Sequence, residues 1–343
     1  MRVRYCKTNL PFKHPFTISK GTKTHQPALV VELDFNGIKG YGEAPAIAYY
    51  NIPVEKMEAD LVAKKVFVEK FAFTSPERYW HYLHHLFPAN GFLVAALDIA
   101  AWDMYGKIRR QPLHALFQAD PTKMPITDYT IGIDTAEKMV AKMQEHPWPV
   151  YKIKLGTDRD IEIMKALREH TDTPLRIDAN AAWTKEEALE KIEAFANMNV
   201  EFIEQPLAKD DWEGMAWLKE RSPLPLVADE SCVSEHDVAK CVGHFDGINI
   251  KLTKCTGITP ALRMIKDARA YGLKIMLGCM NESTIGSAAL AHLAPLADWL
   301  DMDGPLLLSE DIAAGLHYDF GKVALPDAPG LGIEAFVDKQ EWQ

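Results

Sequence analysis

The first third of the chain alternates hydrophobic and polar residues over short runs, a pattern typical of half-buried strands. These runs cover residues 2–7, 28–35 and 38–44. The hydrophobic residues of segment 92–105 instead recur at helical spacing and share one face. We therefore predict an α+β domain over residues 1–125.

From about residue 127, short hydrophobic runs alternate with segments of helical spacing, which is typical of parallel βαβ units. The eight predicted strands lie at residues 129–133, 151–155, 175–179, 202–205, 226–229, 248–252, 275–278 and 299–303. Eight such units favour a closed barrel, so the predicted fold class is α/β, with a modified TIM-like (β/α) barrel over residues 126–305. Residues 306–343 become irregular, and we expect them to pack back on the N-terminal domain.

Composition narrows the range of functions. The chain has 343 residues, 48% of them hydrophobic, and a formal net charge of −10. Such an acidic chain repels nucleic acid and anionic lipid, so neither is an expected partner. The five cysteines lack metal-ligand spacing, which favours reduced thiols in a cytoplasmic protein. The longest apolar runs are strand-sized, so no membrane span is expected. A homo-oligomer is possible from the sequence.

Charged residues gather where the predicted barrel strands end. Side chains alternate between the two faces of a strand, so an outward Ile153 places Lys152 and Lys154 inside the barrel. The same alternation, or a place at a strand end, brings further polar residues to this face: Asp178, Asn180, Glu204, Asp229, Glu230, Lys251, Asp301 and Asp303. Barrel enzymes carry their active sites at the C-terminal ends of the strands, so this face is the predicted active site.

Three of these carboxylates belong to adjacent predicted strands. Asp178, Glu204 and Asp229 form an arc of hard oxygen ligands without a soft one, which favours Mg²⁺ over Zn²⁺. Asn180 and Glu230 are candidates for groups that support these ligands. Glu230 could replace Asp229, because a shift of one residue in register exchanges the two side chains.

Two lysines face each other across the predicted barrel mouth, because strands two and six are four positions apart in a ring of eight. Lys154 and Lys251 would therefore flank any molecule held by the carboxylate arc. One lysine on each face of a carbon is what a 1,1-proton transfer with inversion requires. The proton beside a carboxylate is weakly acidic, so the enediolate needs a cation such as Mg²⁺, together with Lys152.

Together these residues resemble the enolase superfamily, in its muconate-lactonising-type subgroup. The matching elements are Lys152-Ile153-Lys154, Asp178-Ala179-Asn180, Glu204-Gln205-Pro206, Asp229-Glu230-Ser231, Lys251-Leu252-Thr253-Lys254, Gly40-Tyr41-Gly42-Glu43 and residues 95–103. The resemblance covers essentially the whole chain and implies an N-terminal capping domain over the barrel. It also implies Mg²⁺ on Asp178, Glu204 and Asp229, an acid/base pair of Lys154 and Lys251, and a substrate carboxylate on Lys152.

Within this subgroup, Asp301-Met302-Asp303 is similar to the Asp-x-Asp of dipeptide epimerases. A carboxylate pair opposite the metal arc suits a substrate with a carboxylate at one end and an ammonium at the other. The resemblance implies an isomerase, a Mg²⁺-dependent dipeptide epimerase that inverts the α-carbon of the C-terminal residue of an Ala-x dipeptide. Thr130, Cys279 and Met280 at other strand ends are further candidates for substrate binding.

The segment 17–24 is expected to cover the substrate side chain. It contains Lys20, Gly21 and Lys23 but no arginine, whereas epimerases acting on L-Ala-D/L-Glu commonly carry one there. We therefore expect small or apolar residues at position x. An L-Ala-D/L-Glu epimerase of murein peptide recycling, served by Lys20 or Lys23, stays the alternative.

Other chemistries fit the residues less well. An o-succinylbenzoate synthase or another cycloisomerase would share the barrel site but has no need for Asp301 and Asp303. A Schiff-base lyase would leave the three carboxylates unexplained. A metal-stabilised binding protein would need the carboxylates but not two facing lysines.

Overall fold

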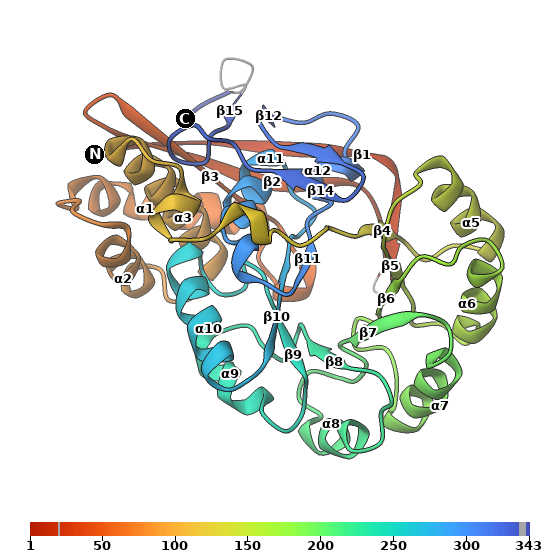
Figure 1. Ribbon diagram of the computed structural model, residues 1–343. Coiled ribbons are helices and arrows are strands. Elements are labelled where there is room, and N and C mark those ends of the chain that lie inside the picture. The colour runs from red at the N-terminus through yellow and green to blue at the C-terminus, as the bar shows by residue number, and fades with distance from the viewer. Residues whose placement is uncertain (20, 336–340) are drawn as a thin grey trace.

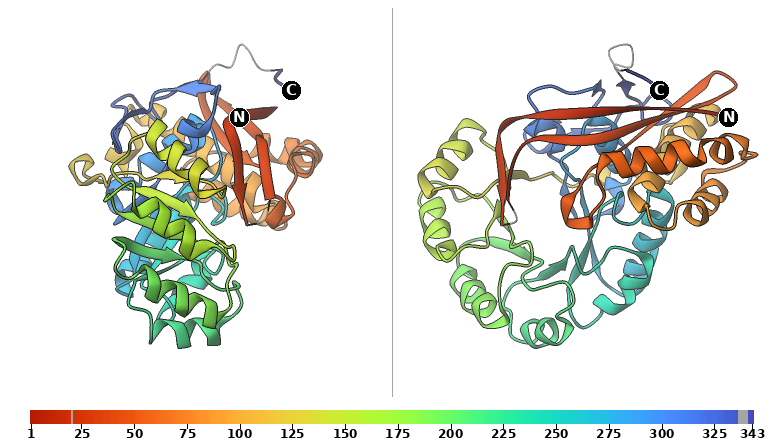
Figure 2. Two further views of the ribbon diagram at one scale, coloured as in Figure 1. Left: turned by 90° about the vertical axis from the view of Figure 1, so that its right-hand side faces the viewer. Right: turned by 180° about the vertical axis from the view of Figure 1, so that it is seen from behind.

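An antiparallel sheet of three strands begins the chain in the computed structural model, which describes residues 1–19, 21–335 and 341–343. Its strands follow in the order β1 (Arg2–Ile18), β2 (Gly21–Phe35) and β3 (Ile38–Pro45). The β1–β2 hairpin is much longer than β3, and its far end bends down beside the barrel (Figure 2, right). The first sheet therefore reaches from the N-terminus to the side of the barrel.

Helices complete this N-terminal domain. They are η1 (Ala48–Tyr50), α1 (Val54–Lys70), α2 (Pro76–Leu86), α3 (Gly91–Arg109), α4 (Leu113–Leu116) and η2 (Pro121–Lys123). Helix α3 packs directly on β3 at Gly40 and Gly42, where a Cβ atom would lie 2.1 and 2.0 Å from carbonyl oxygens of α3. Only glycine permits this approach of helix to strand.

Eight parallel strands follow in sequence order and form the barrel (Figure 1). They are β4 (Tyr129–Ile131), β5 (Tyr151–Lys154), β6 (Leu175–Asp178), β7 (Val200–Glu204), β8 (Leu226–Ala228), β9 (Gly247–Ile250), β10 (Lys274–Gly278) and β11 (Trp299–Asp301). A parallel bridge between Thr127 and Leu300 joins the two ends of the sheet. The predicted barrel fold is confirmed: each strand pairs with its sequence neighbours, and this bridge nearly closes the sheet.

Helices follow the barrel strands, and most of them surround the strands on the outside (Figure 1). They are α5 (Ala136–Glu145), α6 (Asp160–Arg168), α7 (Lys185–Phe195), α8 (Trp212–Lys219), α9 (Glu235–Val238), η3 (Ala239–Cys241), α10 (Ile258–Ala270), α11 (Thr284–Ala291), η4 (Ala294–Leu296) and α12 (Gly304–Leu307). The main core lies between strands and helices, while Phe202, Val227 and Met276 pack in a separate cluster. Outward and inward residues thus alternate as the strand period predicts.

The C-terminal segment returns to the first domain. After the short strands β12 (Ala313–Ala314), β13 (His317–Asp319), β14 (Lys322–Ala324) and β15 (Glu334–Ala335), the final residue pairs with β1. The backbone N–H of Gln343 donates to the Tyr5 carbonyl at 2.9 Å, and the Tyr5 hydroxyl donates to the Gln343 side chain at 2.8 Å. The two chain ends therefore lie side by side in the capping domain (Figure 1).

Buried polar contacts fix the capping domain on the barrel. Asp98 of α3 accepts hydrogen bonds from the backbone and hydroxyl of Thr259 on α10, at 2.9 and 2.8 Å. Glu43 of β3 accepts hydrogen bonds from Ser283 at the start of α11. Burial of these carboxylates without donors would be costly, so the contacts favour one relative placement.

The first hairpin is longer than the sequence predicts. We expected strands at 2–7 and 28–35, but the pairing extends as far as Ile18 and Gly21. The hydrophobic alternation fails there because the register shifts between Pro11 and Phe16 and many of the side chains are exposed. The boundaries at 125/126 and 305/306 stay a prediction.

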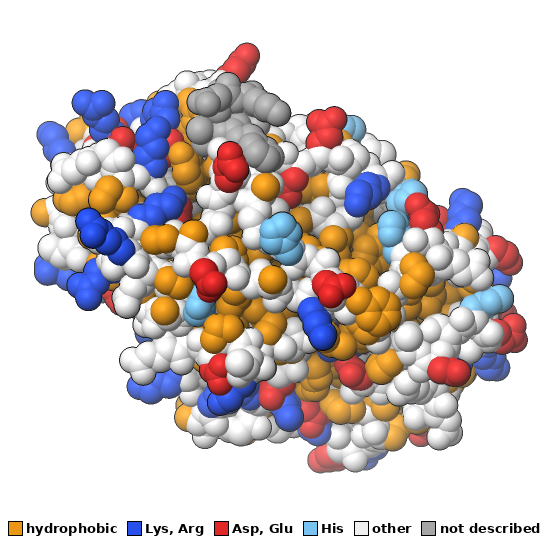
Figure 3. All heavy atoms as spheres, turned by 45° about the horizontal axis from the view of Figure 1, so that its top comes forward, with side chains coloured by type: hydrophobic (Ala, Val, Ile, Leu, Met, Phe, Trp, Pro, Cys, Tyr) orange, Lys and Arg blue, Asp and Glu red, His pale blue; other side chains and the backbone are white. Residues whose placement is uncertain are grey.

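The surface mixes charge types. Acidic and basic side chains alternate with hydrophobic ones over the face drawn in Figure 3. All five cysteines are buried and free of disulfides, in agreement with the predicted thiols. Among the described residues, no helix is both long and apolar enough to cross a bilayer.

Candidate active site

Three buried carboxylates lie together at the C-terminal ends of β6, β7 and β8. One oxygen each from Asp178, Glu204 and Asp229 lies within 4.8 Å of the other two. Asp178 and Glu204 are the last residues of their strands, and Asp229 directly follows β8. The structure thus brings together the three residues predicted as metal ligands, with Asp229 rather than Glu230 in the cluster.

Neighbouring side chains hold this carboxylate cluster in place. Asn249 on β9 donates a hydrogen bond of 2.7 Å to Glu204. The Lys254 ammonium contacts Oδ1 of Asp229 and also donates to the Asp229 carbonyl at 2.7 Å. The amide of Gln205 accepts from the backbone N–H of Asp229 at 3.0 Å. These contacts fix the rotamers of the carboxylates before any ligand binds.

The two proposed acid/base lysines stand on opposite sides of the cluster. Lys154 Nζ lies 2.6 Å from Asp178, at one end of the arc. Lys251 Nζ lies 2.9 Å from Asp229, at the other end. Lys154 ends β5, and Lys251 directly follows β9, so the strands that carry them are four positions apart in the barrel.

Lys152 occupies a deeper position than the other lysines. Its side chain is 1% exposed, and its ammonium lies 2.6 Å from Asp301, 2.7 Å from Glu204 and 3.1 Å from Asp178. It does not line the pocket that opens above the cluster. Lys152 therefore neutralises the carboxylates from below, and its contact with a substrate carboxylate stays a prediction.

Asp303 lies on the side of the barrel mouth opposite the carboxylate cluster, because it follows β11 and the cluster is carried by β6, β7 and β8. It accepts a hydrogen bond of 2.6 Å from the backbone N–H of Thr130. The Cys279 thiol lies 4.0 Å from its other oxygen. Asp303 makes no ion pair with a described lysine or arginine, whereas Asp301 is paired with Lys152. One carboxylate of the pair thus keeps its charge for a ligand.

A pocket lies between the strand ends and the capping domain. Its barrel wall includes Lys154, Lys251, Asp229, Asp301, Asp303, Asn180, Glu230, Thr130, Cys279 and Met280. Its capping wall includes Phe16, Ile18, Lys23, Ile47, Tyr49 and Tyr50. The long hairpin and the segment after β3 therefore complete a space that the barrel leaves open.

The predicted specificity segment is the tip of the β1–β2 hairpin. Lys23 lines the pocket, and its ammonium donates to Gln26 at 3.1 Å. Burial lowers the pKa of Lys23 below its usual range. Gly21 has a φ of +135° and does not belong to the described residues that line the pocket. Lys20 lies outside the described residues.

Electrostatics divide the buried carboxyl groups into two sets. Burial opposes ionisation of Asp178, yet the charges of Lys154 and Lys152 hold its pKa below the usual range. Burial, reinforced by Asp178, raises the pKa of Glu204 to about 7. Burial and the charge of Asp301 raise the pKa of Asp303 to about 6. The lysines therefore stabilise the negative charge of Asp178 but not that of Glu204 or Asp303 to the same extent.

The lysines respond to the same charge. Burial alone would lower the pKa of Lys251, but Asp229 and further carboxylates raise it well above the usual value. The pKa of Lys152 is raised for the same reason, with Asp301 and Glu204 as the main partners. A cation among the carboxylates would weaken this effect, since it would compensate their charge directly.

The cluster fits a hard divalent cation. All three groups are carboxylates, they converge within 4.8 Å, and no sulfur or imidazole lies in the set. The buried Oδ1 of Asn180 beside Asp178 has no hydrogen-bond donor among the described residues. This is an additional acceptor for an ion or its water.

Some residues of the site had no role predicted from the sequence. Asn249 shares strand parity with Lys251, so the alternation rule could have found it. Lys254 stands in a turn after β9, where no periodicity predicts its contact with Asp229. Tyr49 and Tyr50 belong to the short η1 helix of the capping domain, and nothing in their local pattern indicates a pocket wall.

Comparison with known proteins agrees with this fold. Residues 134–339 match the family described as Enolase C-terminal domain-like. Residues 1–117 match the Mandelate racemase / muconate lactonizing enzyme, N-terminal domain. The chain therefore belongs to the enolase superfamily, as its motifs suggest.

Three relatives illustrate the similarity. An L-Ala-D/L-amino acid epimerase of Maribacter sp. is 47% identical over 97% of this chain and 99% of its own length. An L-Ala-D/L-Glu epimerase of Bacteroides thetaiotaomicron is 37% identical over 97% of this chain and 88% of its own. A dipeptide epimerase from Cytophaga hutchinsonii, complexed with Mg and D-Ala-L-Val, superposes with a TM-score of 0.92 at 27% identity, covering 99% and 98% of the two chains. The predicted enzyme class, an isomerase, is confirmed by these relatives.

Proposed function

We propose that this protein is a Mg²⁺-dependent dipeptide epimerase, which inverts the α-carbon of the C-terminal residue of Ala-x dipeptides. The observation that carries the proposal is the order of charges across the mouth. Lys154 and Lys251 stand at the two ends of a three-carboxylate arc, and Asp303 lies apart from it beside Thr130. A dipeptide has the matching charges, a carboxylate beside the reacting carbon and an ammonium at the other end.

Asp178, Glu204 and Asp229 would hold the cation. When bound, Mg²⁺ supplies positive charge that stabilises the enediolate formed beside the substrate carboxylate. Lys254 and Asn249 keep the carboxylate oxygens in place, and Lys152 balances their charge from below. Asn180 and Glu230 lie at the pocket wall as supporting groups.

Two lysines would perform the proton transfer. One neutral lysine removes the α-proton, and the electrons of the C–H bond move into the carboxylate to form the enediolate. The opposite lysine, as an ammonium, gives a proton to the other face of the same carbon. After turnover the two lysines have exchanged protonation states, so both must exchange protons with water before the next cycle.

Asp303 would bind the dipeptide ammonium, because it is buried, lines the pocket and has no lysine or arginine partner among the described residues. Cys279 and Met280 line the same side of the pocket. This binding fixes the distance between the ammonium and the reacting carbon. It would favour α-dipeptides over amino acids, which cannot span both ends.

The side chain of residue x would face the capping wall. Phe16, Ile18 and Ile47 make that wall largely apolar, which supports small or apolar residues at x. Lys23 lines the same pocket, and this specific observation favours a second candidate, an L-Ala-D/L-Glu epimerase. A cytoplasmic location and a homo-oligomer stay predictions.

A dipeptide library in D₂O tests the proposal. Enzyme, Mg²⁺ and mixed L,L-dipeptides are incubated, and mass spectra are compared with a chelator-treated control. The proposal predicts Mg²⁺-dependent uptake of one deuterium at the α-carbon of the C-terminal residue, together with the L,D product. Turnover without any metal, or uptake only into N-succinyl or cyclic substrates, would contradict it.

A further inference from the structure

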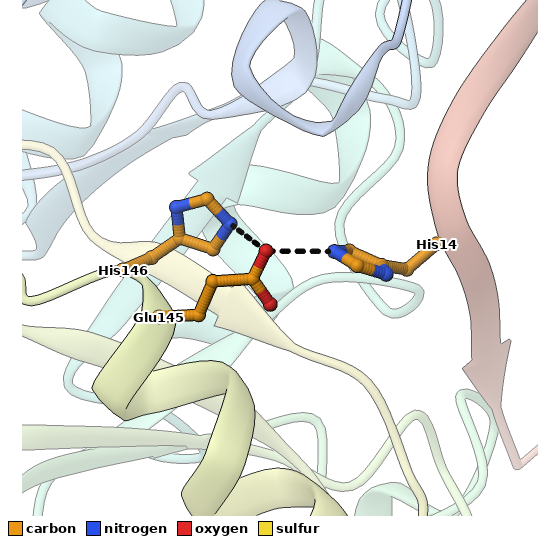
Figure 4. Close-up of side chains that lie close together, drawn as sticks. All are labelled: His14, Glu145 and His146. Carbon is orange, nitrogen blue, oxygen red and sulfur yellow. Dashed lines mark ion pairs between the residues drawn. The ribbon is translucent and has the colours of Figure 1, made fainter.

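A second group of metal-ligating side chains lies outside the barrel mouth. His14 belongs to β1, Glu145 ends α5, and His146 directly follows that helix (Figure 4). One ligand atom from each lies within 4.8 Å of the other two. Both imidazoles turn a ring nitrogen toward the same carboxylate oxygen of Glu145 (Figure 4). The group therefore joins the capping hairpin to the barrel.

The separations within this group are unusual for hydrogen bonds. Nε2 of His14 lies 3.6 Å from Oε1 of Glu145, and Nε2 of His146 lies 3.7 Å from the same oxygen. Charge-assisted N–H···O bonds are shorter, about 2.7–2.9 Å. In a tetrahedral zinc site with Zn–N and Zn–O bonds of about 2.0–2.2 Å, two ligand atoms lie about 3.4 Å apart. The observed distances are close to the spacing of atoms that share an ion.

The ligand atoms are open to a metal. Nε2 of His146 is buried yet has no hydrogen-bond partner among the described residues. His14 and Glu145 are 43% and 54% exposed, so an ion can enter from solvent. The nearby ammonium of Lys142 is turned to Asp134, at 3.5 Å, which leaves the charge of Glu145 for the two imidazoles.

The backbone that carries two of these ligands is fixed in advance. The Tyr151 hydroxyl, from the barrel strand β5, donates to the carbonyl of His146 at 2.9 Å. The Tyr129 ring lies 5.1 Å from the His146 ring, centroid to centroid. Barrel residues thus hold His146, next to Glu145 at the end of α5, while His14 comes from the hairpin.

We propose that His14, Glu145 and His146 form a second metal site, for Zn²⁺ or a related borderline divalent ion, which ties the β1–β2 hairpin to the barrel. Two imidazoles with one carboxylate suit such ions, whereas Mg²⁺ prefers an all-oxygen site. The fourth position is left to water. Because Phe16 and Ile18 of the same strand line the substrate pocket, the ion fixes part of the pocket wall.

Zinc binding in the presence of saturating Mg²⁺ tests the site, because Mg²⁺ occupies the carboxylate cluster of the barrel. Competition against a coloured chelator measures Zn²⁺ affinity for the wild type, His14→Ala, His146→Ala and Glu145→Gln. We expect one site in the wild type and a loss of affinity of at least about tenfold in each variant. Removal of a group that only supports a metal ligand already costs about tenfold or more, so removal of a ligand should cost at least as much.

Two controls separate this site from its rivals. His81→Ala/His85→Ala removes another pair of neighbouring imidazoles, whose ring centroids lie 4.6 Å apart on α2. Cys279→Ser removes the thiol from the buried group Cys279, Asp301 and Asp303. Both controls should bind Zn²⁺ as the wild type does. An absence of wild-type binding, affinity unchanged in His14→Ala and His146→Ala, or affinity lost in either control, would overturn the proposal.

Two further readouts do not depend on turnover. X-ray absorption of bound Zn²⁺ should show imidazole nitrogen and oxygen neighbours without sulfur, and a sulfur neighbour would contradict the site. Amide hydrogen exchange of residues 12–18 should slow on Zn²⁺ addition in the wild type but not in His14→Ala. Exchange that is unchanged by bound zinc in the wild type would refute the tie between hairpin and barrel.

Discussion

The ammonium of Lys152 lies 2.6 Å from Oδ2 of Asp301, a contact that joins β5 to β11 beneath the pocket. This contact gives the two aspartates of Asp301-Met302-Asp303 different surroundings. Asp301 neutralises a buried lysine, whereas Asp303 accepts a hydrogen bond from the Thr130 backbone and makes no ion pair with a lysine or arginine among the described residues. The two residues should therefore respond differently to the same substitution.

Asp303→Asn should lower kcat/KM for free dipeptides by about 10- to 150-fold. This corresponds to the roughly 1.5–3 kcal/mol of a hydrogen bond to a charged group, lost here from the substrate ammonium. The melting temperature should change little. Asp301→Asn is the comparison, and it should also reduce stability, because it leaves Lys152 buried with one partner fewer. N-acetylated dipeptides turned over by the wild type as well as free ones would exclude the ammonium role.

The acidic limb of the pH profile should report Asp303. Its pKa is raised to about 6 by burial and by Asp301, so its charge is lost as the pH falls through about 6. An uncharged Asp303 attracts an ammonium less, so kcat/KM for dipeptides should fall in that range. In Asp303→Asn this component of the limb should disappear. An identical limb in the variant would assign it to another group.

Metal dependence should follow the carboxylate arc. Chelation should abolish activity, and Mg²⁺ or Mn²⁺ should restore it, because all the ligands are oxygens. Glu204→Gln removes one charged ligand and should weaken Mg²⁺ binding by more than about 100-fold, beyond the usual effect of an outer partner. Titration calorimetry with Mg²⁺ measures this. Affinity equal to that of the wild type would place the ion elsewhere.

Lys23 tests the choice of side chain at x. If the apolar wall decides specificity, Lys23→Met should change kcat/KM for Ala-Ala and Ala-Val by less than about threefold, since its apolar stem is kept. Lys13→Met, on the same hairpin but outside this pocket, is the matched control, and Lys20→Met covers the other predicted lysine. A wild-type preference for Ala-Glu that falls at least about tenfold in Lys23→Met would establish the alternative, glutamate specificity.

Strand alternation accounts for much of what the sequence could predict. The inward side chains of Lys152, Lys154 and Asp178 follow from the two-residue period of a strand, and the barrel order then brings them together. Asp229 and Glu230 could not be separated in this way, because they follow the strand end where the period no longer applies. The contact of Asp229 with Lys254 and Lys251 distinguishes them.

The capping wall and the second metal site depend on tertiary structure. Lys23 and Phe16 reach the pocket only because the β1–β2 hairpin is long and bends toward the barrel. His14 is separated from Glu145 and His146 by more than a hundred residues of sequence, so no local spacing indicates their meeting. Such contacts are set by the packing of the domains, which hydrophobic patterns do not encode.

The central claim is that Lys154 and Lys251 act on opposite faces of one carbon, and α-proton exchange in D₂O with the two single alanine variants tests it most directly. Each variant is incubated with Mg²⁺ and with either epimer of the same dipeptide. Epimerisation should be abolished in both variants, because inversion needs one lysine on each face of the α-carbon. Each variant should still exchange the α-proton of one epimer, the epimer whose α-proton faces the remaining lysine. The two variants should therefore act on different epimers. Epimerisation at the wild-type rate in both Lys154→Ala and Lys251→Ala would contradict the two-lysine mechanism.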